Sequence, residues 1–170
     1  MIKKTLTYCF LAIFGILLTA GCASVPLELV DAAADQVRYN HNIDHAEAGD
    51  PIAQYAIGRA LCCSEEAILW FCRSASQGTA DAMFRLGRIY AGDTADGPGL
   101  ISRVIAFVNE GEVDHAQAIY WFQMAAKAGE ATAISASKQI ELSPTERVNL
   151  ADYMSGNAVT DCESLLKAAG

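Results

Sequence analysis

The sequence predicts an all-α fold, an α-solenoid of helix-turn-helix hairpins, and three observations support this prediction. Ala-rich segments with apolar residues three and four positions apart recur along the chain, as in amphipathic helices. Runs of β-branched residues are few, and only four prolines are present to interrupt helices. Finally, a pair of helical segments recurs later in the chain, and units that cannot bury their apolar face alone stack into a solenoid.

The N-terminus has the features of an export signal. Lys3 and Lys4 give a basic start, and an uncharged apolar run follows over residues 6–18. This run is shorter than the ~20 residues that span a bilayer, so it indicates a signal peptide rather than a membrane helix. The run leads into Ala20-Gly21-Cys22, which resembles the bacterial lipobox and predicts cleavage after residue 21 and lipidation of Cys22. The alternative is an ordinary signal peptide in which Cys22 is incidental.

The lipid on Cys22 is the expected attachment to a membrane. A diacylglycerol and an N-linked acyl chain such as palmitate supply more than one chain, which stable anchoring requires at ~0.8 kcal/mol per buried CH₂. Ala23 follows the cysteine where retained lipoproteins carry Asp. By resemblance to the sorting pattern of Gram-negative bacteria, this favours the periplasmic face of the outer membrane. Apart from these acyl chains, no cofactor is predicted.

Removal of residues 1–21 leaves 149 residues, enough for one domain with a core. The mature part keeps all 20 acidic residues and 10 of the 12 basic ones, a formal charge of −10. An acidic surface without a Lys/Arg cluster argues against nucleic acid and against anionic lipid head groups as partners. We divide the mature chain into an anchor linker (22–34), helical repeats (35–141, with an insertion at 93–111) and C-terminal capping helices (142–170).

Local signals place the helices along the chain. The first is expected at about 28–48 and ends at Gly49, a natural left-handed cap. Two helix pairs follow, at about 51–61 with 65–77 and 80–91 with 114–128.

The C-terminal helices have signals of their own. A short capping helix is expected from Ala133. A capping box with Pro at the first helical position, Ser143-Pro144-Thr145-Glu146, starts a helix that runs to about Met154. Gly156 stops that helix, and a last short helix begins near Thr160.

The repeat is visible residue by residue. Ala53-Gln-Tyr-Ala-Ile-Gly58 is echoed 29 residues later by Ala82-Met-Phe-Arg-Leu-Gly87, and Ala67-Ile-Leu-Trp70-Phe is echoed 51 residues later by Ala118-Ile-Tyr-Trp121-Phe. A Gly inside a helix costs ~1 kcal/mol relative to Ala, so Gly58 and Gly87 predict the close approach of a neighbouring helix. Each Trp is expected to fill its hairpin. Gly78 and Gly129 are expected to end the units as left-handed caps.

These residues resemble the Sel-one-like repeat, a relative of the tetratricopeptide repeat. That pattern is Ala-x-x-x-Leu-Gly-x-x-Tyr, a Gly-rich loop, Asp-x-x-x-Ala-x-x-Trp, and then Ala-Ala-x-x-Gly. The second unit matches it at Ala82, Leu86, Gly87, Tyr90, Asp114, Ala118, Trp121, Ala125, Ala126 and Gly129. The first unit matches at Ala53, Gly58, Ala67, Trp70, Ala75 and Gly78. The resemblance covers about residues 46–136. It implies a tetratricopeptide-like superhelix that serves as an adaptor between proteins.

Both loops depart from the family pattern. The first unit is about seven residues shorter between Leu61 and Ala67 and lacks the Asp, and the second is about fifteen residues longer between Tyr90 and Ala118. A third unit begins at Ala133 but lacks the Leu-Gly pair. We interpret it as a terminal cap, because end units of solenoids are atypical.

Cysteines carry the most informative chemistry. The thiols that remain after signal-peptide removal and lipidation are Cys62, Cys63, Cys72 and Cys162. Four thiols outside the cytoplasm are a disulfide set with three connectivities. Cys72 lies about two turns into its helix, ~9 Å from the start, whereas bridged Cα atoms lie within ~7 Å, which disfavours a bridge to Cys62 or Cys63. We expect at least one disulfide, with Cys162 as a candidate partner. A zinc site or buried thiols are the alternatives.

Other motifs carry little chemistry. His41 and His45 have the four-residue spacing of metal ligands, but no third ligand is near in sequence, so we interpret them as surface or capping residues and predict no metal. Ser135 and Lys138 match a Ser-x-x-Lys motif of penicillin-interacting enzymes, whose other elements are absent. No catalytic residues are therefore predicted.

The insertion follows a turn-rich stretch at 92–99 and contains a short apolar helix. It either folds back on the core or docks a partner, because repeat proteins place insertions on one face, often the binding face. Its candidate contact residues are Leu100, Ile101, Val104 and Ile105.

The predicted function is protein–protein interaction without catalysis. The first helices of the hairpins would form a concave surface that holds a peptide or a partner helix, with Arg59, Arg85 and Arg88 as exposed candidates. One alternative is an accessory scaffold for an envelope polysaccharide or secretion assembly. A more remote alternative is an enzyme that acts on cell-wall material.

Overall fold

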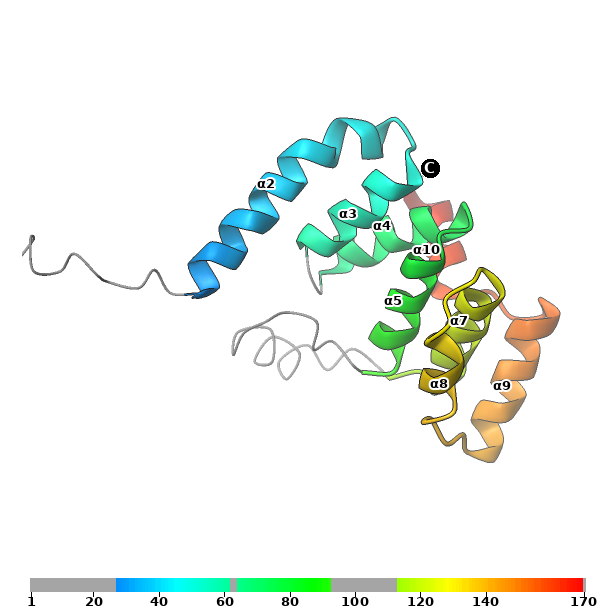
Figure 1. The fold of residues 1–170 in the computed structure, drawn as a ribbon. Coiled ribbons are helices and arrows are strands. Elements are labelled where there is room, and N and C mark those ends of the chain that lie inside the picture. Colours follow the sequence, from blue (N-terminus) through cyan, green and yellow to red (C-terminus); the bar gives the residue numbers. More distant parts are fainter. Residues whose placement is uncertain (1–26, 62–63, 93–112, 170) are drawn as a thin grey trace, which may run out of the picture.

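The computed structural model describes residues 27–61, 64–92 and 113–169, and these ranges are all-α (Figure 1). The described helices are α2 (Leu27–Glu47), α3 (Pro51–Leu61), α4 (Glu65–Ser76), α5 (Ala80–Tyr90), α7 (His115–Lys127), α8 (Ala133–Ser137), α9 (Pro144–Ser155) and α10 (Asp161–Ala169). No strand occurs within these ranges. The predicted helix class is therefore confirmed, and each predicted boundary lies within one or two residues of the helix observed.

Helices that follow one another in the chain pack on one another. α2 packs on α3, α3 on α4, α4 on α5, and α5 on α7, and α7 then contacts both α8 and α9. The last helix breaks this order, because α10 returns along the molecule and packs on α4 (Figure 1). The segment 142–170, predicted as a set of terminal caps, thus divides into α9 beside α7 and α10 against the first hairpin.

The predicted caps are present in the structure. Gly49, Gly78 and Gly129 have φ of 98°, 93° and 106°, the left-handed conformation that lets a helix end without steric cost at Cβ. At the other ends, Ser64 accepts the backbone N–H of Ala67 at 3.0 Å. Side chains at helix starts thus satisfy donors that the helices themselves leave unpaired.

The signals predicted to start and end the C-terminal helices are also present in the structure. Both bonds of the Ser143–Glu146 capping box are formed, and Gly156 ends α9 with φ of 75°. The unit expected from Ala133 is reduced to the five residues of α8, whose Ala133 is buried. A helix this short makes few internal hydrogen bonds, so its position depends on packing against α7.

The two interior glycines allow aromatic rings to lie against the helix backbone. A Cβ built on Gly58 would lie 2.7 Å from the Phe71 ring, and one on Gly87 would lie 2.6 Å from the Phe122 ring. The predicted close approach is confirmed, and its physical cause is a ring from the second helix of each hairpin.

The same rings stack on aromatic residues of the first helices. The Tyr55 and Phe71 ring centroids are 5.9 Å apart at 51°, and those of Phe84 and Phe122 are 5.4 Å apart at 52°. Both Ile57 and Leu86, at matching positions, are fully buried. The two hairpins therefore have the same interior, as their sequence repeat predicts.

Two apolar clusters form the core. The smaller one joins the end of α2 to the first hairpin through Ala46, Ala53, Ile57 and Trp70. The larger one runs from α4 through α5 and α7 and takes in Ala133 of α8 and Cys162 of α10. Among the described helices, none is both long enough and apolar enough to cross a membrane.

Candidate functional site

A disulfide joins the first hairpin to the C-terminus. Cys72 of α4 and Cys162 of α10 are bonded, with Cα atoms 5.2 Å apart across 90 residues of sequence. Both side chains are buried, at 1% and 2% exposure. The prediction of at least one disulfide is confirmed, and Cys162, the candidate partner, is one of its two cysteines. Cys62 and Cys63, like the lipidation residue Cys22, lie outside the described residues.

A buried amide lies at the centre of a polar cluster next to this disulfide. The Gln117 side chain donates to Asp114 Oδ2 at 3.1 Å and to Asp161 Oδ2 at 3.0 Å, while its Oε1 accepts the backbone N–H of Asp161 at 3.1 Å. The side chain of Gln117 is 3% exposed. One amide therefore satisfies two carboxylates and fixes the start of α10 beside the start of α7.

Two phenols complete this cluster. Tyr153 of α9 donates to Asp114 Oδ2 at 3.3 Å, and Tyr90 of α5 is hydrogen-bonded to Asp161. Burial first, and then the nearby Asp114 carboxylate, raises the pKa of Tyr153 to about 12. Burial and Asp161 likewise raise the pKa of Tyr90. Both phenols are thus protonated at neutral pH and act as hydrogen-bond donors, so the cluster connects four helices rather than supplying a base.

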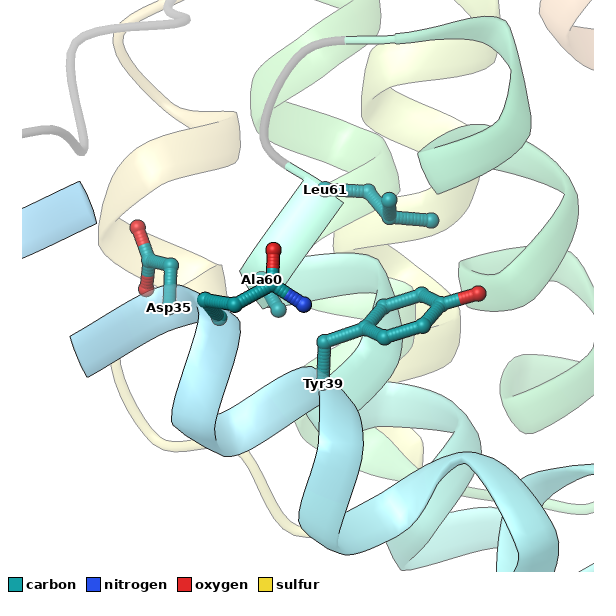
Figure 2. Close-up of a pocket in the computed structure, with 5 residues that line it drawn as sticks. Asp35, Tyr39, Ala60 and Leu61 are labelled. Atoms are coloured by element: carbon teal, nitrogen blue, oxygen red, sulfur yellow. The ribbon is translucent and has the colours of Figure 1, made fainter. Parts of the chain in front are cut away.

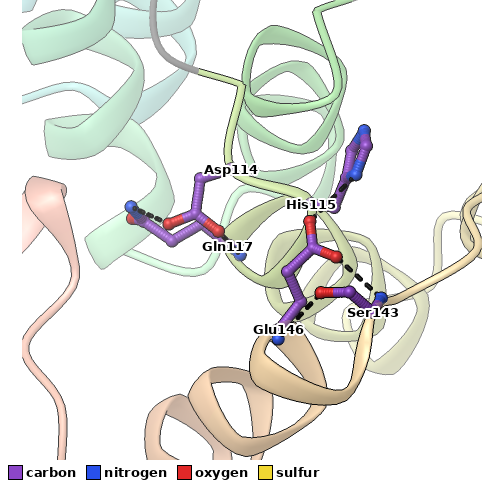
Figure 3. Close-up of polar contacts among 5 residues, drawn as sticks. All are labelled: Asp114, His115, Gln117, Ser143 and Glu146. Carbon is purple, nitrogen blue, oxygen red and sulfur yellow. Dashed lines mark hydrogen bonds and ion pairs between the residues drawn. The ribbon is translucent and has the colours of Figure 1, made fainter.

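A second polar contact joins the starts of α7 and α9. His115 Nδ1 lies 3.1 Å from Glu146 Oε1, and Glu146 also closes the capping box with Ser143 (Figure 3). The hydrogen bonds from Ser143 lower the pKa of Glu146, and His115 adds to the effect. This contact is partly exposed and orients α9 on α7.

One open cleft lies between the end of α3 and α2. It encloses about 400 Å³ and is lined by Asp35, Gln36, Tyr39, Ala60 and Leu61. Figure 2 shows the Tyr39 ring of α2 across from Leu61 of α3, with Asp35 at the rim. Asp35 is paired with Arg38 on the same helix. The cleft is therefore mostly apolar, and its acidic group already has a counter-ion.

The predicted binding arginines differ in exposure. Arg59 at the end of α3 is exposed, whereas Arg85 and Arg88 of α5 are half-buried. The prediction that all three are exposed is therefore wrong for Arg85 and Arg88, whose side chains take part in intramolecular contacts. The predicted contacts of the insertion, Leu100, Ile101, Val104 and Ile105, lie outside the described residues.

The two histidines of the first helix are exposed on α2, as expected for surface residues. Within the ranges that the structure describes, no group of three or more His, Cys, Asp or Glu side chains is arranged to hold a metal ion.

The sequence repeat contains a signal for the polar cluster that helical periodicity does not show. Glu66 in the first hairpin and Gln117 in the second occupy matching positions, 51 residues apart. Glu66 accepts the indole N–H of Trp70 at 3.4 Å, whereas Gln117 turns to Asp114 and Asp161. A change from a charged residue to a neutral amide at a matching repeat position was the detectable sign of a second role.

Comparison with known proteins identifies no relative of this chain. No protein-family model matches the chain, and neither curated proteins nor solved structures give a significant match. The resemblance to the Sel-one-like repeat therefore rests on the residues of the two hairpins themselves.

Proposed function

We propose that this chain is a lipid-anchored helical-repeat protein that binds another protein at the periplasmic face of the outer membrane. The single observation that supports the repeat class is the duplicated interior of the two hairpins, in which Gly58 with Phe71 and Gly87 with Phe122 make the same contact. Equivalent packing in successive hairpins is how a superhelix of the tetratricopeptide type is built. In such a stack, the first helices of the hairpins lie along one concave surface.

The binding surface that we propose is the concave surface formed by α3 and α5, the first helices of the two hairpins. Arg59 is exposed at the end of α3, and the half-buried Arg88 takes the matching position in the second hairpin, 29 residues later. Because the chain carries a net charge of −8, a basic residue repeated at hairpin spacing distinguishes this side from the rest of the surface. A partner segment with carboxylates at a similar spacing is the complement of such a surface.

A matched pair of charge reversals tests the surface. The lipoprotein carrying Arg59→Glu is compared with Lys127→Glu, because both residues are exposed at the end of a helix and both changes alter the net charge equally. After crosslinking in cells, we expect the amount of the captured partner to fall by about tenfold with Arg59→Glu and to stay near the wild-type amount with Lys127→Glu. An equal loss with both variants would exclude this surface, and capture no greater than that of a tag-only control would exclude the binding role.

The anchor is tested separately. Cys22→Ser should move the folded domain from the membrane fraction to the soluble fraction, or leave an unprocessed precursor. Cys9→Ser, which changes a cysteine inside the proposed signal peptide, is the control and should leave fractionation unchanged. If processed Cys22→Ser protein still fractionates with membranes, lipidation is not what attaches it.

A further inference from the structure

The attachment of α10 is concentrated at its first two residues. Of the nine residues of α10, Cys162 is the one that is buried. Leu166 packs on the core from the edge, and Leu165 remains 36% exposed. The polar contacts of α10 with Gln117 come from Asp161, directly before Cys162. The rest of the helix therefore has little apolar area that would hold it in place.

The hairpins do not depend on α10 for their own packing. The larger apolar cluster takes in Cys162, with Leu166 at its edge, and its other buried members belong to α4, α5, α7 and α8. The smaller cluster contains nothing from α10. Removal of α10 from α4 would therefore leave the glycine–phenylalanine contacts of both hairpins intact.

We propose that the Cys72–Cys162 disulfide is a redox-controlled latch: while it is closed, α10 lies on α4, and when it is reduced, α10 leaves α4 while both hairpins stay folded. The hydrogen bonds between Asp161 and Gln117 do not replace the disulfide, because they are few and the exposed Asp161 can bond to water instead once α10 leaves. Loss of the covalent link also restores the conformational freedom of a segment joined to α9 only through residues 156–160.

The chemical step is thiol–disulfide exchange with a dithiol reductant. A thiolate of the reductant attacks one sulfur of the disulfide, forms a mixed disulfide and releases the other cysteine as a thiolate, which takes up a proton. The second thiol of the reductant then loses its proton and displaces the remaining cysteine. The dithiol ends as a disulfide, and Cys72 and Cys162 end as thiols. Because both sulfurs belong to buried residues, the attack requires a local fluctuation that exposes one sulfur while the bond still holds Cys162 against α4.

Hydrogen exchange read by mass spectrometry tests the latch. The full-length lipoprotein in detergent is compared before and after dithiothreitol, with Cys62 and Cys63 replaced by Ser so that Cys72 and Cys162 form the disulfide under test. After reduction, the amides of α10 should exchange at least about tenfold faster, and those of α3 and α5 should stay within about twofold of their oxidised rates. Iodoacetamide should then label both Cys72 and Cys162.

A variant without the disulfide gives the matching control. Cys162→Ser should show the fast exchange of α10 without reductant and should not respond to dithiothreitol. If α10 keeps its protection after reduction or in this variant, noncovalent contacts hold it and there is no latch. If α3 and α5 lose protection together with α10, the disulfide is a staple of the whole domain and the proposal is wrong.

Discussion

The two hairpins share an interior but differ in the surroundings of their tryptophans. In the first hairpin, the indole N–H of Trp70 donates to Glu66, and the guanidinium of Arg73 lies 4.5 Å from the centre of the Trp70 ring system. In the second, the indole nitrogen of Trp121 is buried and has no hydrogen-bond partner among the described residues. The residue that could have served it, Gln117, is used to hold α10.

This difference shows how a repeat acquires a second role at the expense of a local contact. The exchange of Glu66 for Gln117 leaves one buried donor unpaired, which costs about 1–3 kcal/mol. In return, Gln117 satisfies two carboxylates and one backbone N–H between α7 and α10. The first hairpin keeps the simpler arrangement, and the second connects the C-terminal helices.

The largest effect is expected from giving the second hairpin the residue of the first. Gln117→Glu places a third carboxylate between Asp114 and Asp161, and urea unfolding at pH 7 should show a loss of about 3 kcal/mol. The reverse change, Glu66→Gln, should stay within about 0.5 kcal/mol because Glu66 is exposed. Below pH 4 the added carboxyl becomes neutral, so the penalty should shrink. Equal effects in the two hairpins would show that Gln117 has no special role.

The interior glycines should behave alike in the two hairpins. Gly58→Ala and Gly87→Ala each push a Cβ into a phenylalanine ring, and we expect a loss of about 2 kcal/mol in each case. At an open position in a helix, the same change stabilises by about 1 kcal/mol, so the sign distinguishes crowding from helix propensity. Combining Gly58→Ala with Phe71→Leu should recover part of the loss. A neutral result at either glycine would break the equivalence of the hairpins.

The tryptophans should respond differently to the same change. Trp70→Phe loses a hydrogen bond and a stacked guanidinium, whereas Trp121→Phe removes an unpaired buried donor. Both variants lose some packing area, so the informative quantity is the difference between their losses of unfolding free energy. Chemical denaturation should show Trp121→Phe as the less destabilising change by about 1 kcal/mol. The opposite order would mean that the Trp121 N–H is satisfied in solution.

The smallest effect concerns alkaline pH. Because burial and Asp114 raise the pKa of Tyr153 to about 12, against 10 in the unfolded chain, the unfolded state loses this proton first as the pH rises. The stability that Tyr153 contributes is complete below pH 10 and is lost as the pH rises from 10 to 12. Tyr153→Phe should therefore lose less stability than the wild type over that range. At pH 7–9 the two proteins should show no difference in slope, which provides the baseline.

Much of the fold could be predicted because its causes are local. The left-handed glycines and the capping box are encoded within a few residues of where they act. Gly58 and Gly87 indicate a close neighbour by their position inside a helix, although the rings that crowd them come from the second helix of each hairpin. The repeat also predicted that Trp70 and Trp121 are buried. The repeat could not predict which aromatic residue packs against each interior glycine, because the repeated Trp-Phe pair offers two candidates in each hairpin.

The packing of α10 on α4 could not be predicted from the sequence, for a different reason. Cys72 and Cys162 are 90 residues apart, and the segment that brings them together, 156–160, carries only turn signals. The polar cluster depends on the same return, since Gln117 and Asp161 meet only once α10 has docked. Long-range contacts of this kind follow from the assembled packing and have no periodicity to reveal them.

The covalent link between α4 and α10 also has a mechanical consequence. A pull applied to the two ends of the domain passes along the chain to Cys72, crosses the disulfide and leaves through Cys162. The residues between them bear no tension while the bond lasts, so α5, α7, α8 and α9 are shielded. Their contour length, about 300 Å at 3.3–3.6 Å per residue, becomes extensible only after reduction. Under such a pull, the oxidised domain therefore extends little, whereas the reduced domain can extend much further.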